Sequence, residues 1–132
     1  MKGFIITGTS SGIGHELCKV LLENADNKVI GIGRTQNIEH TNYNHIVLDL
    51  NNISEIENIE FPSWSNAAQI SLIHNAGWIG PIQKIGNQEL GAIASAYIIN
   101  LVAPAVLSSQ FISIYKSSKA EKVILSVSSG AA

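Results

Sequence analysis

The strongest constraint on the fold of this chain is a glycine-rich turn at residues 7–14, which reads Thr-Gly-Thr-Ser-Ser-Gly-Ile-Gly. Before it, residues 4–7 form a short apolar run typical of a buried strand. After it, Leu17, Val20 and Leu21 recur at the spacing of one helix face. A strand that passes through a glycine turn into a helix is the opening unit of an α/β nucleotide-binding fold.

The rest of the chain continues the alternation of strands and helices. We expect further strands at residues 28–32, 45–48, 70–73 and 122–127. Between them we expect a weakly helical segment at 51–68 and a long helix at 87–115, bent at Pro104. The segment between the second and third strands is too short for a full crossover helix. This pattern predicts one α/β domain, residues 1–132, with a Rossmann-type doubly wound parallel sheet in strand order 3-2-1-4-5, covered on both faces.

Each glycine of the turn has a distinct expected role. Gly8 permits the tight turn, Gly12 lets the backbone approach a pyrophosphate, and Gly14 allows close packing of helix and strand. The N–H groups at the start of the helix would then face the phosphates. The turn lacks the Gly-Lys-Ser/Thr ending of a P-loop, which argues against nucleotide triphosphate hydrolysis. The alternative is a glycine/serine turn that binds no ligand.

The residue expected to read the cofactor ribose is Arg34. It stands about 20 residues after the last glycine, just past the second strand, where an Asp or Glu would bind the 2′-hydroxyl of NAD. An arginine there pairs instead with a 2′-phosphate, and no acidic residue occurs between Lys28 and Asn37. The sequence therefore favours NADPH, with Thr35 as a second donor to the same phosphate. The alternative is an ordinary surface arginine at a strand end.

Composition excludes several classes of function. Charged residues make up 14% of the chain against roughly 25% in an average domain, so much of its surface should be buried in the sheet, a cofactor site or a partner. The net charge of −2, with only 8 scattered Lys and Arg residues, argues against a nucleic-acid partner. A lone Cys18 and four histidines without ligand spacing predict no disulfide and no metal site. Unbroken apolar runs far shorter than ~18 residues, and no visible signal peptide, predict a soluble cytoplasmic protein without a membrane partner.

Five motifs, in order, resemble the short-chain dehydrogenase/reductase family. They are the glycine turn, Asp49-Leu50 after the third strand, Asn75-Ala76-Gly77 after the fourth, Asn100 in the long helix and Ser128-Ser129-Gly130 after the fifth. Residues 100–104 and 127–132 are similar to the sepiapterin reductase and benzil reductase branch. The resemblance covers the whole chain.

The resemblance implies roles for these residues. Asp49, with Leu50 beside it, would accept a hydrogen bond from the adenine amino group, and Asn100 would hold a water in a proton relay. Ser129, rather than Ser128, would bind the substrate carbonyl and stabilise the developing oxyanion. The residues expected at the cofactor are Gly8, Ser10, Ser11, Gly12, Ile13, Gly14, Arg34, Thr35, Asp49, Leu50, Asn75, Ala76 and Gly77.

Two departures from the family pattern qualify this expectation. The family's catalytic Tyr-x-x-x-Lys should follow the serine, beyond residue 132, so we expect a domain truncated before its general acid, without the family's C-terminal strands and helices, and inactive alone. Tyr115 and Lys119 share that spacing but precede Ser129, and we interpret them as a coincidence. His74 also replaces the commoner asparagine before Asn75.

Three hypotheses follow from these observations. The first is an NADPH-dependent reductase that transfers hydride to a ketone or aldehyde, with a dicarbonyl or pterin-like substrate implied by the branch. The second is a non-catalytic NADP(H)-binding module or degenerate reductase, and the third is a purely structural or interaction α/β domain. Because the strand at 122–127 would have an open edge, we also expect that edge to be covered, either by the rest of a longer polypeptide or by another copy of the chain in a homo-oligomer.

Overall fold

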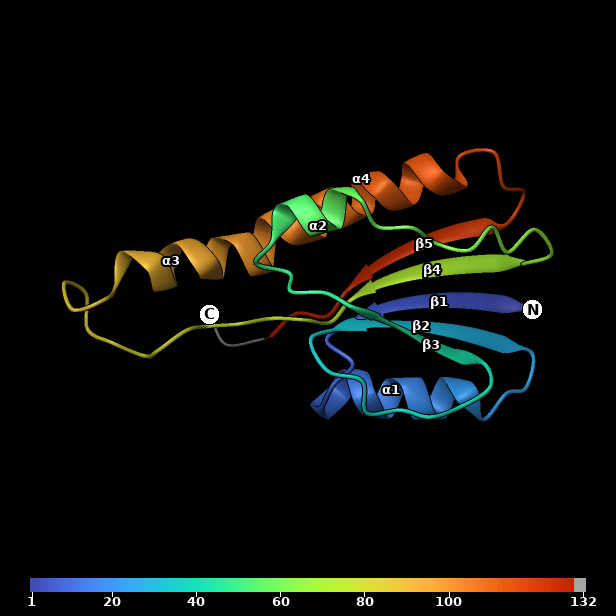
Figure 1. Cartoon of the computed structure of the whole chain (residues 1–132), viewed down its shortest axis with the longest axis horizontal. Coiled ribbons are helices and arrows are strands. Elements are labelled where there is room, and N and C mark those ends of the chain that lie inside the picture. The colour runs from blue at the N-terminus through green and yellow to red at the C-terminus, as the bar shows by residue number, and fades with distance from the viewer. Residues whose placement is uncertain (130–132) are drawn as a thin grey trace.

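The fold is a single five-stranded parallel sheet, as a computed structural model of the chain shows for residues 1–129 (Figure 1). The strands are β1 (Lys2–Thr7), β2 (Asn27–Gly33), β3 (Tyr43–Val47), β4 (Gln69–His74) and β5 (Glu121–Ser126). Their order is β3-β2-β1-β4-β5, and every neighbouring pair is parallel. The predicted strand order is therefore confirmed.

Helices lie on both faces of the sheet (Figure 1). The helix α1 (Gly12–Leu22) covers one face, and α2 (Ile53–Glu57) and α4 (Ala103–Tyr115) cover the other. The α2 helix ends at Glu57, so it is much shorter than the weakly helical segment predicted at 51–68. The β2–β3 connection carries no helix within residues 34–42, as expected from its length.

The long helix predicted at 87–115 has three parts. They are α3 (Leu90–Tyr97), a π-helical turn η1 (Ile98–Val102) and α4. In η1 the Ala103 N–H donates to the carbonyl of Ile98, five residues earlier. Pro104 follows at once, and because it has no N–H it cannot bond the carbonyl of Asn100 in the usual helical pattern. The break thus lies immediately before the proline that was expected to bend the helix.

The central strands alternate their side chains between two cores. Phe4 and Ile6 of β1 point to the α1 side, where they pack with Cys18, whereas Ile5 packs on the α4 side with Phe111. Burial raises the pKa of the Cys18 thiol to about 12, which is the behaviour of a small core residue. This two-sided burial fixes the carboxyl ends of β1, β2 and β4, where the site lies.

The expected coverage of both faces fails at β5 and α3. Ile124 and Leu125 of β5 are exposed, and within Leu90–Tyr97 of α3 every residue is at least partly exposed. The helix α3 extends beyond the end of the sheet (Figure 1). The low charge of the chain thus corresponds to apolar surface left open as well as to a buried core.

The helix Leu90–Tyr115 also corrects one expectation about apolar length. It is long enough to cross a membrane, and its mean hydropathy of 1.9 over an 18-residue window is high enough. Counting unbroken apolar runs missed it, because Asn100 and several serines interrupt every run. Its Leu107, Phe111 and Tyr115 pack into the core beneath it. The absence of a membrane partner stays a prediction.

Candidate functional site

A cleft of about 590 Å³ lies at the carboxyl ends of the strands, where α/β sheets bind their ligands. The cleft also touches Trp78, Ser95 and Ile99 from the α3 side. Gly12, Gly14 and Thr35 adjoin it without lining it. The predicted cofactor residues that line it are Gly8, Ser10, Ser11, Ile13, Arg34, Asp49, Leu50, Asn75, Ala76 and Gly77.

The three glycines of the turn differ in what surrounds them. Gly8 has a φ of +73°, and a side chain there would meet the Ala76 Cα at 2.8 Å. A side chain on Gly14 would meet the Gly8 carbonyl oxygen at 2.3 Å and Asn75 Nδ2 at 2.4 Å, so Gly14 packs against the turn and Asn75. Gly12 has a φ of +61° and nothing within 4 Å of an added Cβ. Gly12 therefore leaves open space beside the start of α1, as a phosphate-binding turn requires.

Hydrogen bonds join the ends of β1 and β4 beneath the cleft. Asn75 Nδ2 donates to the carbonyls of Thr7 and Gly8, both at 3.1 Å. The backbone N–H groups of Asn75 and Ala76 donate to Thr7 Oγ1 at 3.1 and 3.0 Å. Asn75 thus supports the turn, and the backbone of Ala76 and Gly77 is left to line the cleft.

Asn100 holds the segment that follows Gly77. Its Nδ2 donates to the Trp78 carbonyl at 2.6 Å, and its Oδ1 accepts from the Trp78 N–H at 2.8 Å. The side chain therefore pairs with backbone, where the resemblance implied a bound water. Asn100 lies in the middle of the π-turn η1.

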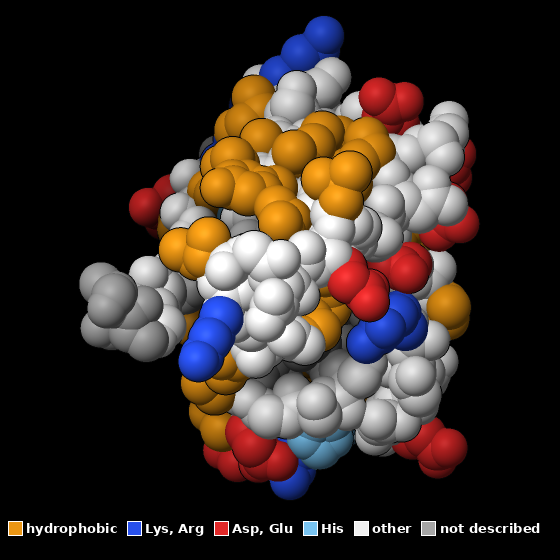
Figure 2. All heavy atoms as spheres, turned by 90° about the vertical axis from the view of Figure 1, so that its left-hand side faces the viewer, with side chains coloured by type: hydrophobic (Ala, Val, Ile, Leu, Met, Phe, Trp, Pro, Cys, Tyr) orange, Lys and Arg blue, Asp and Glu red, His pale blue; other side chains and the backbone are white. Residues whose placement is uncertain are grey.

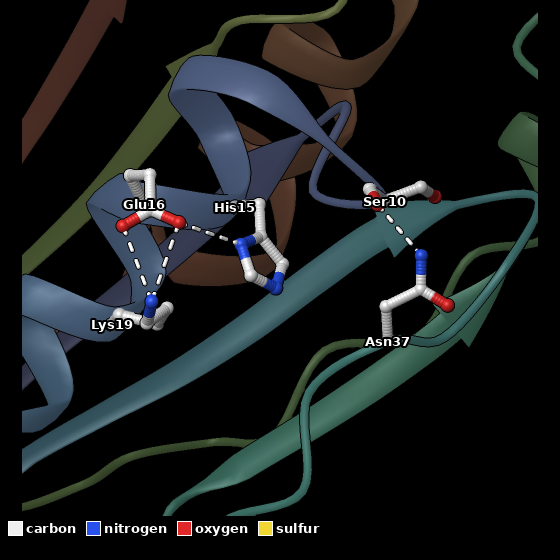
Figure 3. A network of polar contacts seen from close by, with 5 residues as sticks. All are labelled: Ser10, His15, Glu16, Lys19 and Asn37. Carbon is white, nitrogen blue, oxygen red and sulfur yellow. Dashed lines mark hydrogen bonds and ion pairs between the residues drawn. The ribbon is translucent and has the colours of Figure 1, made fainter.

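The segment after β2 is tied to the glycine turn at two points. The Ser10 hydroxyl donates to the Thr35 carbonyl at 2.7 Å. Asn37 Nδ2 donates to the Ser10 carbonyl at 2.7 Å (Figure 3). Arg34, the residue before Thr35, lines the cleft and is exposed. No sequence pattern singles out Asn37, since its role depends on how the loop folds back over the turn.

The neighbouring polar residues of α1 form a separate surface cluster (Figure 3). Glu16 accepts from His15 Nδ1 at 3.1 Å and from Lys19 Nζ at 3.3 Å. The hydrogen bonds from His15 and then Lys19 lower the pKa of the exposed Glu16 carboxyl. These residues do not line the cleft and add no group to it.

Asp49 and Leu50 lie on the β3 side of the cleft. Asp49 Oδ1 accepts from the backbone N–H of Asn51 at 2.9 Å, and Leu50 is buried beside it. Asn51 also lines the cleft, although the sequence analysis did not select it. An Asx turn at this position fixes the direction of the Asp49 carboxylate.

The predicted catalytic serine lies at the end of the described chain. Ser129 follows β5, is exposed, and is not in the cleft lining; residues 130–132 of the same motif lie outside the described residues. Tyr115 lies deep in the core, with its hydroxyl donating to the Pro62 carbonyl at 2.8 Å, and burial raises its pKa. Tyr115 therefore has no access to the cleft, in agreement with our interpretation of Tyr115 and Lys119 as a coincidence.

The described part of the chain, residues 1–129, holds no group of three or more His, Cys, Asp or Glu side chains placed to bind a metal. The polar groups that line the cleft are backbone amides, side-chain amides and hydroxyls, the Arg34 guanidinium and the Asp49 carboxylate.

Comparison with known proteins places this chain in a family. The model of the family described as short chain dehydrogenase matches residues 2–132. The benzil reductase ((S)-benzoin forming) of Bacillus cereus is 36% identical over 144 residues, covering 99% of this chain and 57% of that protein. This chain thus spans little more than half the length of that relative.

Solved structures agree with this placement. A short-chain dehydrogenase/reductase from Burkholderia vietnamiensis has a TM-score of 0.81 at 25% identity, covering 98% of this chain and 64% of the other. A 4-hydroxyisoleucine dehydrogenase complexed with NADH has a TM-score of 0.75 at 27% identity, covering 98% and 56%. The chain belongs to the short-chain dehydrogenase family, whose members are oxidoreductases that bind nicotinamide cofactors.

Proposed function

We propose that this chain forms the NADP(H)-binding part of a carbonyl reductase. The observation that carries the proposal is the convergence, in one cleft, of the glycine turn at Gly8, Ser10 and Ser11, the side chain of Arg34 and the Asn75–Gly77 segment, with the open space at Gly12 beside it. A dinucleotide fits this donor set, because its pyrophosphate needs uncrowded backbone N–H groups and its ribose phosphate needs a cation.

NADP(H) is favoured over NAD(H) by the charge at the end of β2. Arg34 lines the cleft, and the sequence from Lys28 to Asn37 contains no carboxylate that would repel a 2′-phosphate. The binding of the ribose phosphate by Arg34 would be a charge-assisted contact of about 1.5–3 kcal/mol, which corresponds to at least tenfold in affinity.

Fluorescence titration of the purified chain with NADPH and with NADH tests this proposal. We expect a dissociation constant for NADPH at least about tenfold lower than that for NADH. Equal affinities would contradict the NADP(H) assignment alone. Binding of neither nucleotide would contradict the nucleotide-binding function and favour a purely structural α/β domain.

The reaction we propose is reduction of a ketone or aldehyde. When bound, the nicotinamide supplies the hydride. Ser129 would orient the substrate carbonyl by a hydrogen bond, and Asn100 would keep the wall at Trp78 in place. A dicarbonyl or pterin-like substrate is the class we favour, since the Bacillus cereus relative is a benzil reductase.

The 132 residues contain no Tyr-x-x-x-Lys after Ser129, so the isolated chain should bind cofactor without reducing a carbonyl. Assay of NADPH oxidation with benzil tests this. Turnover above background would show that another residue acts as the acid. The second candidate function is a non-catalytic NADP(H)-binding module or degenerate reductase, and finding Tyr-x-x-x-Lys in the reading frame beyond residue 132 would contradict it.

We further propose that the protein is a cytoplasmic homo-oligomer that takes a small-molecule carbonyl substrate. The exposed apolar residues of α3 and β5, among them Leu90 and Leu125, support association with a second copy. Sedimentation of the purified chain, and fractionation of cells that express it, test these two statements.

A further inference from the structure

We propose that Tyr43 and His45 are positioning residues that hold Arg34 in place relative to the glycine turn and thereby set the preference for a 2′-phosphate. This inference rests on the proposed NADP(H) function. Neither side chain lines the cleft; both act from β3, on the α1 side of the sheet.

A continuous chain of hydrogen bonds carries the proposal. Thr9 Oγ1 lies 3.2 Å from the Tyr43 hydroxyl, which lies 2.7 Å from His45 Nδ1, and His45 Nε2 lies 3.0 Å from the Gly33 carbonyl oxygen. Thr9 is 1% exposed and Tyr43 is 6% exposed, so water does not compete for these groups. The chain connects the glycine turn, β3 and the end of β2.

The acceptor at one end fixes the direction of every bond in the neutral state. A carbonyl only accepts, so His45 Nε2 carries the proton and donates to Gly33. In a neutral imidazole Nδ1 then accepts, so the Tyr43 hydroxyl donates to it and its oxygen receives the Thr9 hydroxyl. Burial raises the pKa of Tyr43, which keeps this hydroxyl a donor.

The Gly33 carbonyl belongs to the peptide bond that begins Arg34. It also accepts from the Leu48 N–H at 3.1 Å, so two donors hold the plane of this peptide. The plane sets the direction in which the Arg34 backbone leaves β2. Removing the His45 donor leaves the Leu48 N–H as the one donor to the Gly33 carbonyl, so the Gly33–Arg34 peptide can tilt about that bond.

The other end of the chain lies within the turn itself. Thr9 stands between Gly8, whose N–H donates to the Ile32 carbonyl at 2.8 Å, and Ser10, whose hydroxyl donates to the Thr35 carbonyl. Two sets of hydrogen bonds therefore join the glycine turn to the end of β2 and the loop after it. One set is the exposed pair that Ser10 makes with Thr35 and Asn37, and the other is the Thr9–Tyr43–His45 chain.

Two glycines in β2 make room for this chain. An added Cβ on Gly31 would lie 2.0 Å from the Tyr43 hydroxyl oxygen and 2.5 Å from Thr9 Oγ1. One on Gly33 would lie 2.9 Å from Ser10 Oγ and 3.7 Å from His45 Cε1. Glycine inside a strand often marks such a close approach of another group. The Gly-Ile-Gly ending of β2 is therefore shaped to the polar chain.

Tyr43→Phe tests the inference, because it removes the central hydroxyl and keeps the ring. The matched control is Tyr115→Phe, which also removes one buried hydroxyl bond but at Pro62, away from the cleft. For Tyr43→Phe we expect the dissociation constant of NADPH to rise about threefold to tenfold and that of NADH to change less, so the preference falls. Tyr115→Phe should lower the melting temperature without altering the preference. An unchanged preference in folded Tyr43→Phe would overturn the inference.

A second pair of variants tests the donor to Gly33. His45→Gln keeps a donor of similar reach and should retain more of the NADPH preference than His45→Ala; equal losses would contradict a positioning role. If Tyr43→Phe does not fold, nitrogen NMR of the unsubstituted chain still decides, since the neutral His45 ring must carry its proton on Nε2, and the opposite tautomer would contradict the proposed chain. Titration of the unsubstituted chain separates the two ideas. Equal affinities for NADPH and NADH there contradict the NADP(H) assignment on which this inference rests, whereas an NADPH preference that neither Tyr43→Phe nor His45→Ala alters contradicts this inference alone.

Discussion

At the scale of single residues, the side chain at position 34 decides which dinucleotide the cleft prefers. Arg34→Asp replaces a cation with an anion that would repel a 2′-phosphate and accept a bond from a ribose hydroxyl. We expect the NADPH preference to be abolished or reversed in a titration with both nucleotides. Lys2→Asp makes the same change of charge at the start of β1, at the other end of the sheet from the cleft, and should leave the NADPH preference intact. A similar loss in both variants would indicate a general charge effect instead of a contact.

His74 makes the stability of the fold depend on pH. It is 6% exposed, its Nε2 lies 2.9 Å from Ser108 Oγ, and among residues 1–129 its Nδ1 has no hydrogen-bond partner. Burial lowers the pKa of His74 below its ordinary 6.5, so the folded state favours the neutral ring. The stability this confers is full above the unfolded pKa and is lost as pH falls from there through the folded pKa.

We therefore expect His74→Asn to flatten the dependence of the unfolding free energy on pH between about 7 and 5. Urea denaturation across that range measures it. Asn44→Ala, at an exposed and non-titrating position, is the control and should keep the slope of the unsubstituted chain. If both variants keep that slope, the titration of His74 does not contribute to the pH dependence of the unfolding free energy.

The residues that the sequence located best are those whose role follows from spacing along the chain. Gly8 lies in the turn after β1 and Arg34 directly follows β2. Both therefore lie at the carboxyl ends of the strands, where the cleft is. Asn37, Tyr43 and His45 were missed, because their contacts depend on how a helix-free loop crosses from β2 to β3. No periodic pattern encodes that path.

At the scale of elements, the π-turn η1 contains Asn100, whose side chain bonds the Trp78 backbone in the wall of the cleft. Asn100→Ala removes both hydrogen bonds to the Trp78 backbone and should lower the free energy of unfolding by about 1–3 kcal/mol. It should also weaken NADPH binding, since the segment after Gly77 is released. Denaturation and titration measure the two effects. Asn44→Ala, exposed on β3, is the control; equal effects in both variants would contradict the role of Asn100.

Strands were easier to predict than helices in this chain. Buried parallel strands appear as apolar runs, and every predicted strand lies within two residues of the observed one at each end. The helix at 87–115 was predicted as one bent element, because Pro104 is visible in the sequence whereas the five-residue hydrogen bonding before it is not. The short α2 shows the opposite error, since isoleucines three apart indicate a longer helix than forms.

At the scale of the whole molecule, apolar surface gathers at the end occupied by α3 (Figure 2). Ile82, Ile85 and Leu90 are 90%, 98% and 82% exposed there, and within residues 1–129 β5 pairs with β4 alone. Such surfaces favour association. We expect light scattering of the isolated chain to show self-association instead of a lone monomer. A monodisperse, cooperatively melting 14.1 kDa species would contradict this expectation.

The bonds that Asn75 and Ala76 make to Thr7 and Gly8 have a consequence for the timing of cofactor capture. They join β1 and β4 within the fold itself, so we expect the floor of the cleft to be preorganised and the entropy of ordering it to be incurred at folding, not at binding. Nucleotide association should then proceed in one kinetic phase whose rate rises linearly with concentration. Stopped-flow fluorescence with NADPH would show this, and a rate that levels off at high concentration would reveal a slow rearrangement of the floor before or after contact.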